Sequence, residues 1–185
     1  MAGRVYNFEN PERFVAGAIG QAGSRTFYLQ ARDAGRLVSV LLEKVQVTLL
    51  AERLKELLGD VRLGGAGVPE EPAADEIDSA PLEEPIDEIF RVGTMAIVWD
   101  GEDETILVEA REMTEQDEEL EATGEGDEDD DESDVVRVRL RPAQALAFSQ
   151  RALEVVAAGR PPCPFCGQPL NPEGHICARR NGFMH

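Results

Sequence analysis

The chain has 185 residues with a formal charge of −19, and 42% of its residues are hydrophobic. This length and apolar content suit one domain, or two small fused units, with a hydrophobic core. Three cysteines make a poor disulfide framework, and no apolar run approaches the ~20 residues of a membrane-spanning helix. No secretory signal is visible at the N-terminus. We therefore expect a reduced, cytoplasmic protein without membrane association.

The acidic residues gather in two segments that contain no Lys or Arg. Residues 69–88 hold nine acids and residues 115–134 hold thirteen, so the rest of the chain is close to neutral. Both segments lack the apolar content that would offset the entropy cost of ordering them. We interpret residues 64–88 as a solvated Pro- and Gly-rich linker and residues 115–134 as a disordered acidic insertion. The alternative is that the insertion mimics nucleic acid or binds a basic partner.

The first half of the chain predicts three strands followed by a helix. Residues 13–20, 25–32 and 36–43 have strand composition, with turn signals between them. An apolar stripe at helical spacing then predicts a helix that stops near Gly59 and Asp60. The stripe consists of Val47, Leu50, Leu54, Leu57 and Leu58.

The second half predicts the same order of elements. Residues 91–99 and 104–112 have strand composition and flank the hairpin signal Asp100-Gly101. After the acidic insertion, residues 135–141 alternate as a strand with one charged face. Pro142 suits the first turn of a helix that runs to about residue 158.

The two halves also match residue by residue. A shift of 98 positions places Val38 on Val136, Gln46 on Gln144 and Arg53 on Arg151, and a shift of 79 places Ala31 on Ala110. Strand–helix segments of similar patterning can match in this way by chance, but the polar matches and the shared element order favour an internal duplication. We therefore predict an α+β fold. Units 1–63 and 89–160 each contribute three strands and a helix to one antiparallel sheet core, and a tail follows at 161–185.

The tail carries the strongest chemical signal. Cys163 and Cys166 form a Cys-x-x-Cys pair followed by Gly, as in the knuckle of many zinc ribbons, and His175 and Cys177 supply a second pair. Three thiolates and one imidazole fill a tetrahedral shell with no position left for water, so we predict a structural zinc ion. Two other interpretations remain: a redox Cys-x-x-Cys pair, and free thiols beside an incidental His.

Several segments of the chain resemble an uncharacterised family of actinobacterial proteins. They are residues 13–17, 27–31, 42–47 and 50–54, together with the tail from Cys163 through the His-x-Cys pair to Gly182. The similarity covers nearly the whole chain except the acidic segments. A Pro is common in that family where this chain has Ala178, a departure that leaves the metal ligands untouched. The resemblance implies no established activity. It does imply a pathway shared with a histidine-phosphatase-like and a lipid-kinase-like neighbour.

Three classes of function are compatible with these features. The leading hypothesis is a non-enzymatic zinc-binding adaptor or regulatory protein with a protein partner. The alternative is nucleic-acid binding through Arg137, Arg139 and Arg141 on one strand face, with Arg179 and Arg180 after the zinc loop. Scarce aromatic residues and the acidic loops disfavour that alternative. An enzyme with a site built from dispersed polar residues is the third class, and the sequence designates no catalytic residues for it.

Overall fold

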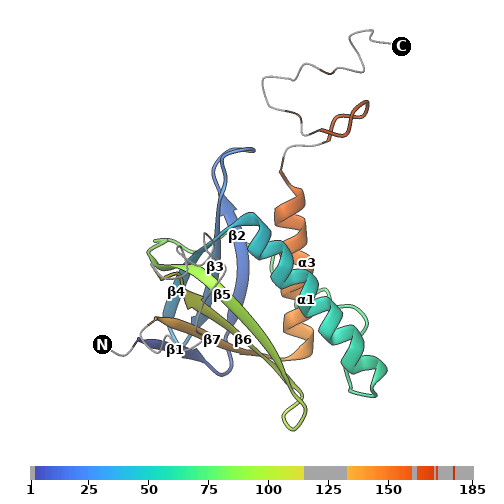
Figure 1. The fold of residues 1–185 in the computed structure, drawn as a ribbon. Helices are drawn as coiled ribbons and strands as arrows, with labels where there is room; N and C mark the ends of the chain where they lie inside the picture. Colours follow the sequence, from blue (N-terminus) through green and yellow to red (C-terminus); the bar gives the residue numbers. More distant parts are fainter. Residues whose placement is uncertain (1–2, 115–132, 160–161, 169, 171–176, 178–185) are drawn as a thin grey trace, which may run out of the picture.

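A computed structural model describes residues 3–114, 133–159, 162–168, 170 and 177 of the chain. These residues form a strongly curved sheet with two helices packed side by side against it (Figure 1). In chain order the elements are β1 (Val5–Phe8), β2 (Arg13–Ile19), β3 (Thr26–Asp33), β4 (Arg36–Leu42), α1 (Lys44–Leu63), β5 (Glu88–Asp100), β6 (Thr105–Glu112), β7 (Val135–Leu140) and α3 (Pro142–Ala157).

All six predicted strands and both predicted helices are present close to their expected bounds. Two differences stand out. The short strand β1 was not expected, because four residues are too few to show a periodic pattern. Helix α1 also continues beyond Gly59 to Leu63, since a single glycine weakens a helix without ending it. Pro142 occupies the first turn of α3, as predicted.

The sheet is mixed, so the prediction of an antiparallel core is wrong in part. The strand order is β1-β7-β6-β5-β4-β3-β2, and two neighbouring pairs, β1 with β7 and β4 with β5, run parallel. The chain leaves β4, passes through α1 and returns to β5. A crossover through a helix of this kind brings consecutive strands side by side in the same direction. The remaining pairs are antiparallel, as expected for hairpins.

The sheet curls because its two edge strands are neighbours in the sequence. From Phe8 at the end of β1 to Arg13 at the start of β2, the chain can span at most about 17 Å. Seven strands laid flat would hold the outermost two about 29 Å apart. The sheet must therefore bend round until its edges approach each other, and it encloses one continuous apolar core.

The two predicted units have the same strand order, and the second and third strands of each unit pair in the same register. In the first unit Ala31 of β3 lies opposite Val38 of β4. In the second unit Ala110 of β6 lies opposite Val136 of β7, which are the residues that the shifts of 79 and 98 positions assign. These residues therefore pair as a duplication requires. Common ancestry of the two units stays a prediction.

Matching glutamines fix the start of each helix. The side-chain oxygens of Gln46 and Gln144 accept hydrogen bonds from the backbone N–H groups just before α1 and α3, at 2.8 and 3.0 Å. Each side-chain amide then donates to the other unit: Gln46 to the carbonyl of Val92 at 3.0 Å, and Gln144 to that of Pro11 at 3.2 Å. Each helix is thus capped and tied to the opposite unit by one side chain.

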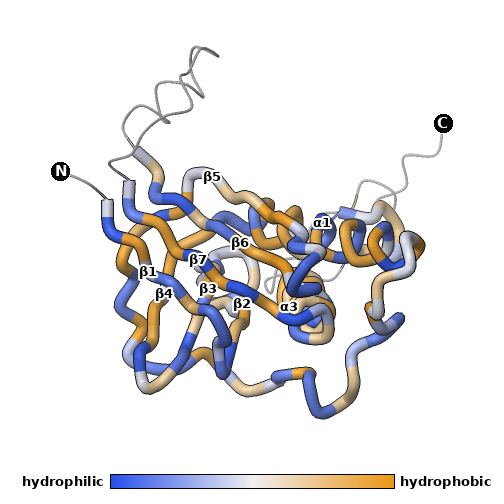
Figure 2. The backbone as a smooth tube through the Cα atoms, turned by 90° about the horizontal axis from the view of Figure 1, so that it is seen from below, coloured by the Kyte–Doolittle hydropathy of each residue, from blue (hydrophilic) through white to orange (hydrophobic). Residues whose placement is uncertain are grey.

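Helix α1 buries the apolar stripe predicted from the sequence, except that Leu57 is only half-buried. Along the strands and helices, apolar residues alternate with polar ones (Figure 2). Leu54 and Ala152, which the 98-residue shift aligns, are both completely buried. Ring stacking joins α3 to β2, with the Phe14 and Phe148 centroids 4.6 Å apart. Within the described residues, neither helix is long and apolar enough to cross a membrane.

Part of the acidic linker packs on the body of the protein, which corrects its interpretation as a solvated segment. We call residues 78–83 the strap. The strap lies against β2, β3 and α3, where Asp78 accepts hydrogen bonds from Arg13 and Arg151. Composition gave the wrong prediction because the strap is ordered largely by polar partners elsewhere in the chain. The predicted insertion at 115–134 lies outside the described residues except at its C-terminal end.

The strap makes its closest approach to the sheet at Gly17, and this contact can be tested by substitution. A Cβ atom at Gly17 would lie 2.5 Å from Cγ of Leu82. We expect Gly17→Ala to destabilise the protein by about 1–3 kcal/mol, because Leu82 must move away. The control is Gly59→Ala in α1, where nothing lies within 4 Å of the new methyl group. That change should stabilise by about 0.5–1 kcal/mol. Urea denaturation of both variants tests the pair, and equal effects would contradict the contact.

Candidate metal centre

A tight loop after α3 presents the first two cysteines. The N–H of Gly167 donates to the carbonyl of Cys163 at 2.8 Å, and the N–H of Cys163 donates to the carbonyl of Gln168 at 2.7 Å. Gly167 has a φ of 73°, a left-handed conformation that non-glycine residues rarely adopt. This glycine lets the backbone reverse within one turn, so that Cys163 and Cys166 can present their sulfurs to the same point.

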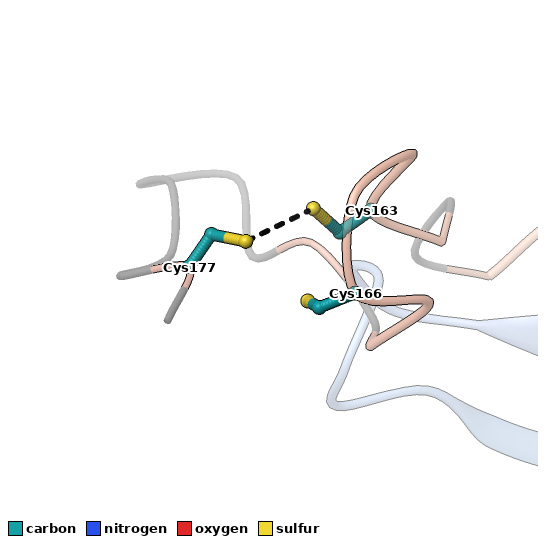
Figure 3. Close-up of side chains that lie close together, drawn as sticks. All are labelled: Cys163, Cys166 and Cys177. Carbon is teal, nitrogen blue, oxygen red and sulfur yellow. Dashed lines mark hydrogen bonds between the residues drawn. The ribbon is translucent and has the colours of Figure 1, made fainter. Parts of the chain in front are cut away.

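Cys177 completes a group of three thiols. The sulfur atoms of Cys163, Cys166 and Cys177 lie within 4.8 Å of one another, and their side chains point toward a shared space (Figure 3). The Cys163 and Cys177 sulfurs are 3.9 Å apart. Two thiolates bound to one tetrahedral zinc ion, each at about 2.3 Å, are separated by ~3.8 Å. The spacing therefore fits two ligands of one metal ion.

The chemistry of the thiols is also suited to metal binding. Cys163 and Cys177 are buried and Cys166 is half-buried. Burial acts to raise the pKa of Cys163, but hydrogen bonds from the Phe165 and Cys166 amides and from the neighbouring thiols hold that pKa below its ordinary value. The amide hydrogen bond from Gln168 lowers the pKa of Cys166, but burial and the Cys163 and Cys177 thiols outweigh it and raise that pKa above its ordinary value. These contacts favour ionisation of Cys163 over ionisation of Cys166, and the thiolate is the form that binds metals.

The structure brings together three of the four predicted ligands. His175 lies outside the described residues, so the assignment of the fourth ligand stays a prediction. The Cys-x-x-Cys and Gly signals of the sequence were sufficient to locate the cluster. The three thiols together can hold a metal ion, and the identity of that ion is not decided by the geometry.

The three β7-face arginines assigned to a nucleic-acid surface each have a carboxylate partner. Arg137 pairs with Glu109 at 2.7 Å, Arg139 pairs with both Glu9 and Asp100 at 3.0 Å, and Arg141 lies 3.5 Å from Glu76. A phosphate would have to displace these acids before it could bind. The geometry therefore gives no support to nucleic-acid binding by this strand face. Arg179 and Arg180 lie outside the described residues.

Comparison with known proteins places the chain in a family. The sequence profile described as protein of unknown function (DUF3090) matches residues 6–177, which include the sheet apart from Val5, both helices and all three cysteines. The chain belongs to the DUF3090 family. No curated protein and no solved structure matches it. Membership of DUF3090 agrees with the resemblance of the sequence to an uncharacterised family, and it assigns no activity.

Two buried arginines of this DUF3090 protein were missed by sequence analysis. The Arg13 and Arg151 side chains are each only 9% exposed, and both contact Asp78 of the strap. Arg151 does lie on the buried side of the helical stripe, between Phe148 and Ala152, but Arg53 occupies the same place in α1 and is exposed. Position in the helix therefore could not identify the buried arginine without knowledge of the strap.

Proposed function

We propose that this protein is a zinc-binding adaptor or regulatory protein, in which Cys163, Cys166, His175 and Cys177 hold one structural zinc ion. The convergence of three sulfur atoms within 4.8 Å carries the proposal. Thiolates favour zinc over magnesium or calcium, which prefer oxygen ligands. With His175 as fourth ligand the coordination shell is closed, so the ion shapes the tail rather than activating water.

A closed zinc site gives the tail a defined surface in a short length of chain. Residues 161–185 contain too few apolar side chains to fold around a core, and a metal can supply the stability that a core supplies in larger domains. The role we propose for this surface is to bind a protein partner. The duplicated body would serve as the rigid platform behind it, and the matching registers and capping glutamines support that origin.

Metal analysis tests the zinc site directly. We expect protein purified under reducing conditions to contain about one zinc per chain, and Cys163→Ser or Cys166→Ser to lose it, because a tetrahedral site needs each thiolate. Substituting cobalt should produce thiolate-to-metal charge-transfer absorption in the wild type alone. The control is Ser149→Ala on α3, far from the cluster in sequence. Protein that contains no zinc and binds none when it is supplied would refute the site.

Affinity purification from the native cell tests the adaptor role. The bait is the intact chain, and the comparison bait is the Cys163→Ser variant at matched expression. We expect a protein that is retained by the first and lost by the second, since the partner surface depends on the zinc-ordered tail. If both baits retain the same proteins, partner binding does not depend on the metal site, and the adaptor role proposed here is contradicted.

A further inference from the structure

The strap lies in a groove between the free edge of β2 and helix α3. Arg151 of α3 donates from Nε to the carbonyl of Ala16 in β2 at 3.0 Å, so this side chain bridges the two walls of the groove. Cavities flank the strap on both sides. One of about 320 Å³ is lined in part by Arg13, Arg141 and Arg151, and one of about 410 Å³ is lined in part by Arg151, Leu82 and Ile86. The groove is therefore larger than the segment that occupies it.

One carboxylate of the strap is shared by two buried guanidinium groups. Asp78 accepts hydrogen bonds from Arg13 at 2.5 and 3.0 Å and from Arg151 at 2.9 Å. Burial lowers the pKa of Arg151, Asp78 opposes that effect, and the positive charge of Arg13 adds to it. Without Asp78, Arg151 would lose its only carboxylate partner in the strap and Arg13 would keep only Glu83 at 3.4 Å, which is unfavourable for two cations at low dielectric. The groove therefore requires an acidic occupant.

The body also recognises the main chain of the strap. The Gln30 side chain donates to the carbonyl of Glu83 and accepts from its N–H, both at 2.9 Å, as a neighbouring strand would do. Arg13 donates to the carbonyls of Ala80 and Pro81 at 3.0 and 2.8 Å, and Arg151 donates to that of Ala80 at 2.7 Å. Contacts of this kind accept any extended peptide, whatever its side chains.

One side chain of the strap is fixed by shape. The Leu82 side chain lies against Gly17. Only glycine, which has no Cβ atom, leaves room for it at that point of β2. The recognised features are an acid in the place of Asp78, an extended backbone, and an apolar side chain four residues later. They form a short linear pattern that a segment of another protein can also present.

We propose that the groove between β2 and α3 is a binding site for an acidic, extended peptide of a partner protein, and that the strap occupies it as an internal competitor. This proposal names a partner class for the adaptor function proposed above and rests on it. The bound partner would place its own acid between Arg13 and Arg151 and its own apolar residue on Gly17. The strap would then be released into solvent.

A titration with a labelled peptide tests the proposal on the full-length protein. The probe is a fluorescein-labelled synthetic peptide with the sequence of residues 74–85. The variant is Asp78→Ala with Leu82→Ala, which weakens the strap but leaves the groove intact. Because an internal competitor lowers apparent affinity by the fraction of molecules with an open groove, we expect the variant to bind the probe at least about tenfold more tightly than the wild type. Fluorescence anisotropy measures both affinities.

Matched controls decide what the titration means. Glu70→Ala with Glu71→Ala removes two acids from the same linker upstream of the strap and should bind the probe like the wild type. A probe with Asn in place of its Asp78 should bind the strap variant at least about tenfold more weakly, because Arg151 then lacks its carboxylate partner and Arg13 keeps only Glu83. Equal affinity of wild type and strap variant, or equal binding of the two probes, would overturn the proposal.

Circular dichroism shows whether the strap variant is folded. If it is not, the titration is repeated with Leu82→Ala alone, which keeps the anion between the arginines and should still bind the probe several-fold more tightly than the wild type. Equal affinity there would also overturn the proposal. Zinc content is measured in the same samples. None of these substitutions changes a cysteine, so the zinc content of the samples tests the proposed function independently of the groove.

Discussion

Phe148→Ala is expected to destabilise the whole chain by about 3–5 kcal/mol, and Leu50→Ala by about 2–5 kcal/mol. The two residues occupy equivalent places on α3 and α1, and their side chains are 2% and 3% exposed. Phe148 also stacks on Phe14 of β2, so its removal opens a cavity between helix and sheet. Neither site can collapse easily, because each lies in the middle of the continuous core.

Both variants should lose the entire fold in a single transition. The helices pack on each other and on one curved sheet, so neither unit keeps a core of its own when the other is lost. Urea denaturation followed by circular dichroism and by Trp99 fluorescence measures the two free energies of unfolding. The control is Leu63→Ala at the end of α1, where the side chain is 85% exposed and the change should be below about 0.5 kcal/mol. Two separate transitions would contradict a shared core.

Most of the fold could be predicted because it depends on local pattern. Alternating apolar residues specified each long strand, and the shifts that aligned Ala31 with Ala110 and Val38 with Val136 also predicted which residues lie opposite one another in the sheet. The parallel pairs depend on how the chain crosses between units, which no local pattern contains. Strand β1 was missed for the same reason, since its four residues gain their strand conformation by pairing with β7.

The cysteine cluster was predictable because a metal site has strict requirements for residue type and spacing. For the arginines of the β7 face, the sequence left nucleic-acid binding open as the disfavoured alternative, because charge along a strand does not reveal what lies beside it. Glu109 is next to Arg137 only through the register of β6 and β7. The strap was misinterpreted because its ordering depends on Arg13 and Arg151, whose positions in the sequence are 65 and 73 residues away from Asp78. Long-range polar contacts of this kind leave no periodic signal.

The contributions of Arg151 and Arg53 to stability can be compared with a matched pair of alanine variants. We expect Arg151→Ala to destabilise the protein by about 3 kcal/mol, in the range observed when one partner of a buried ion pair is removed. The change leaves the Ala16 and Ala80 carbonyls without this donor and leaves Asp78 with Arg13 alone. Arg53→Ala, at the equivalent position of α1, should cost no more than about 0.5 kcal/mol, because its ion pair with Glu56 is exposed.

Arg151→Lys separates the role of charge from the role of geometry. Lysine keeps the positive charge near Asp78 but lacks the planar fork that reaches the Ala16, Asp78 and Ala80 oxygens together. We therefore expect Arg151→Lys to recover less than half of the stability lost in Arg151→Ala, with unfolding measured in urea at matched ionic strength. Full recovery by lysine would mean that Arg151 holds the strap by its charge alone. Equal losses of stability in Arg151→Ala and Arg53→Ala would mean that the strap does not hold α3 to the sheet, because the exposed Arg53 is not held by a strap.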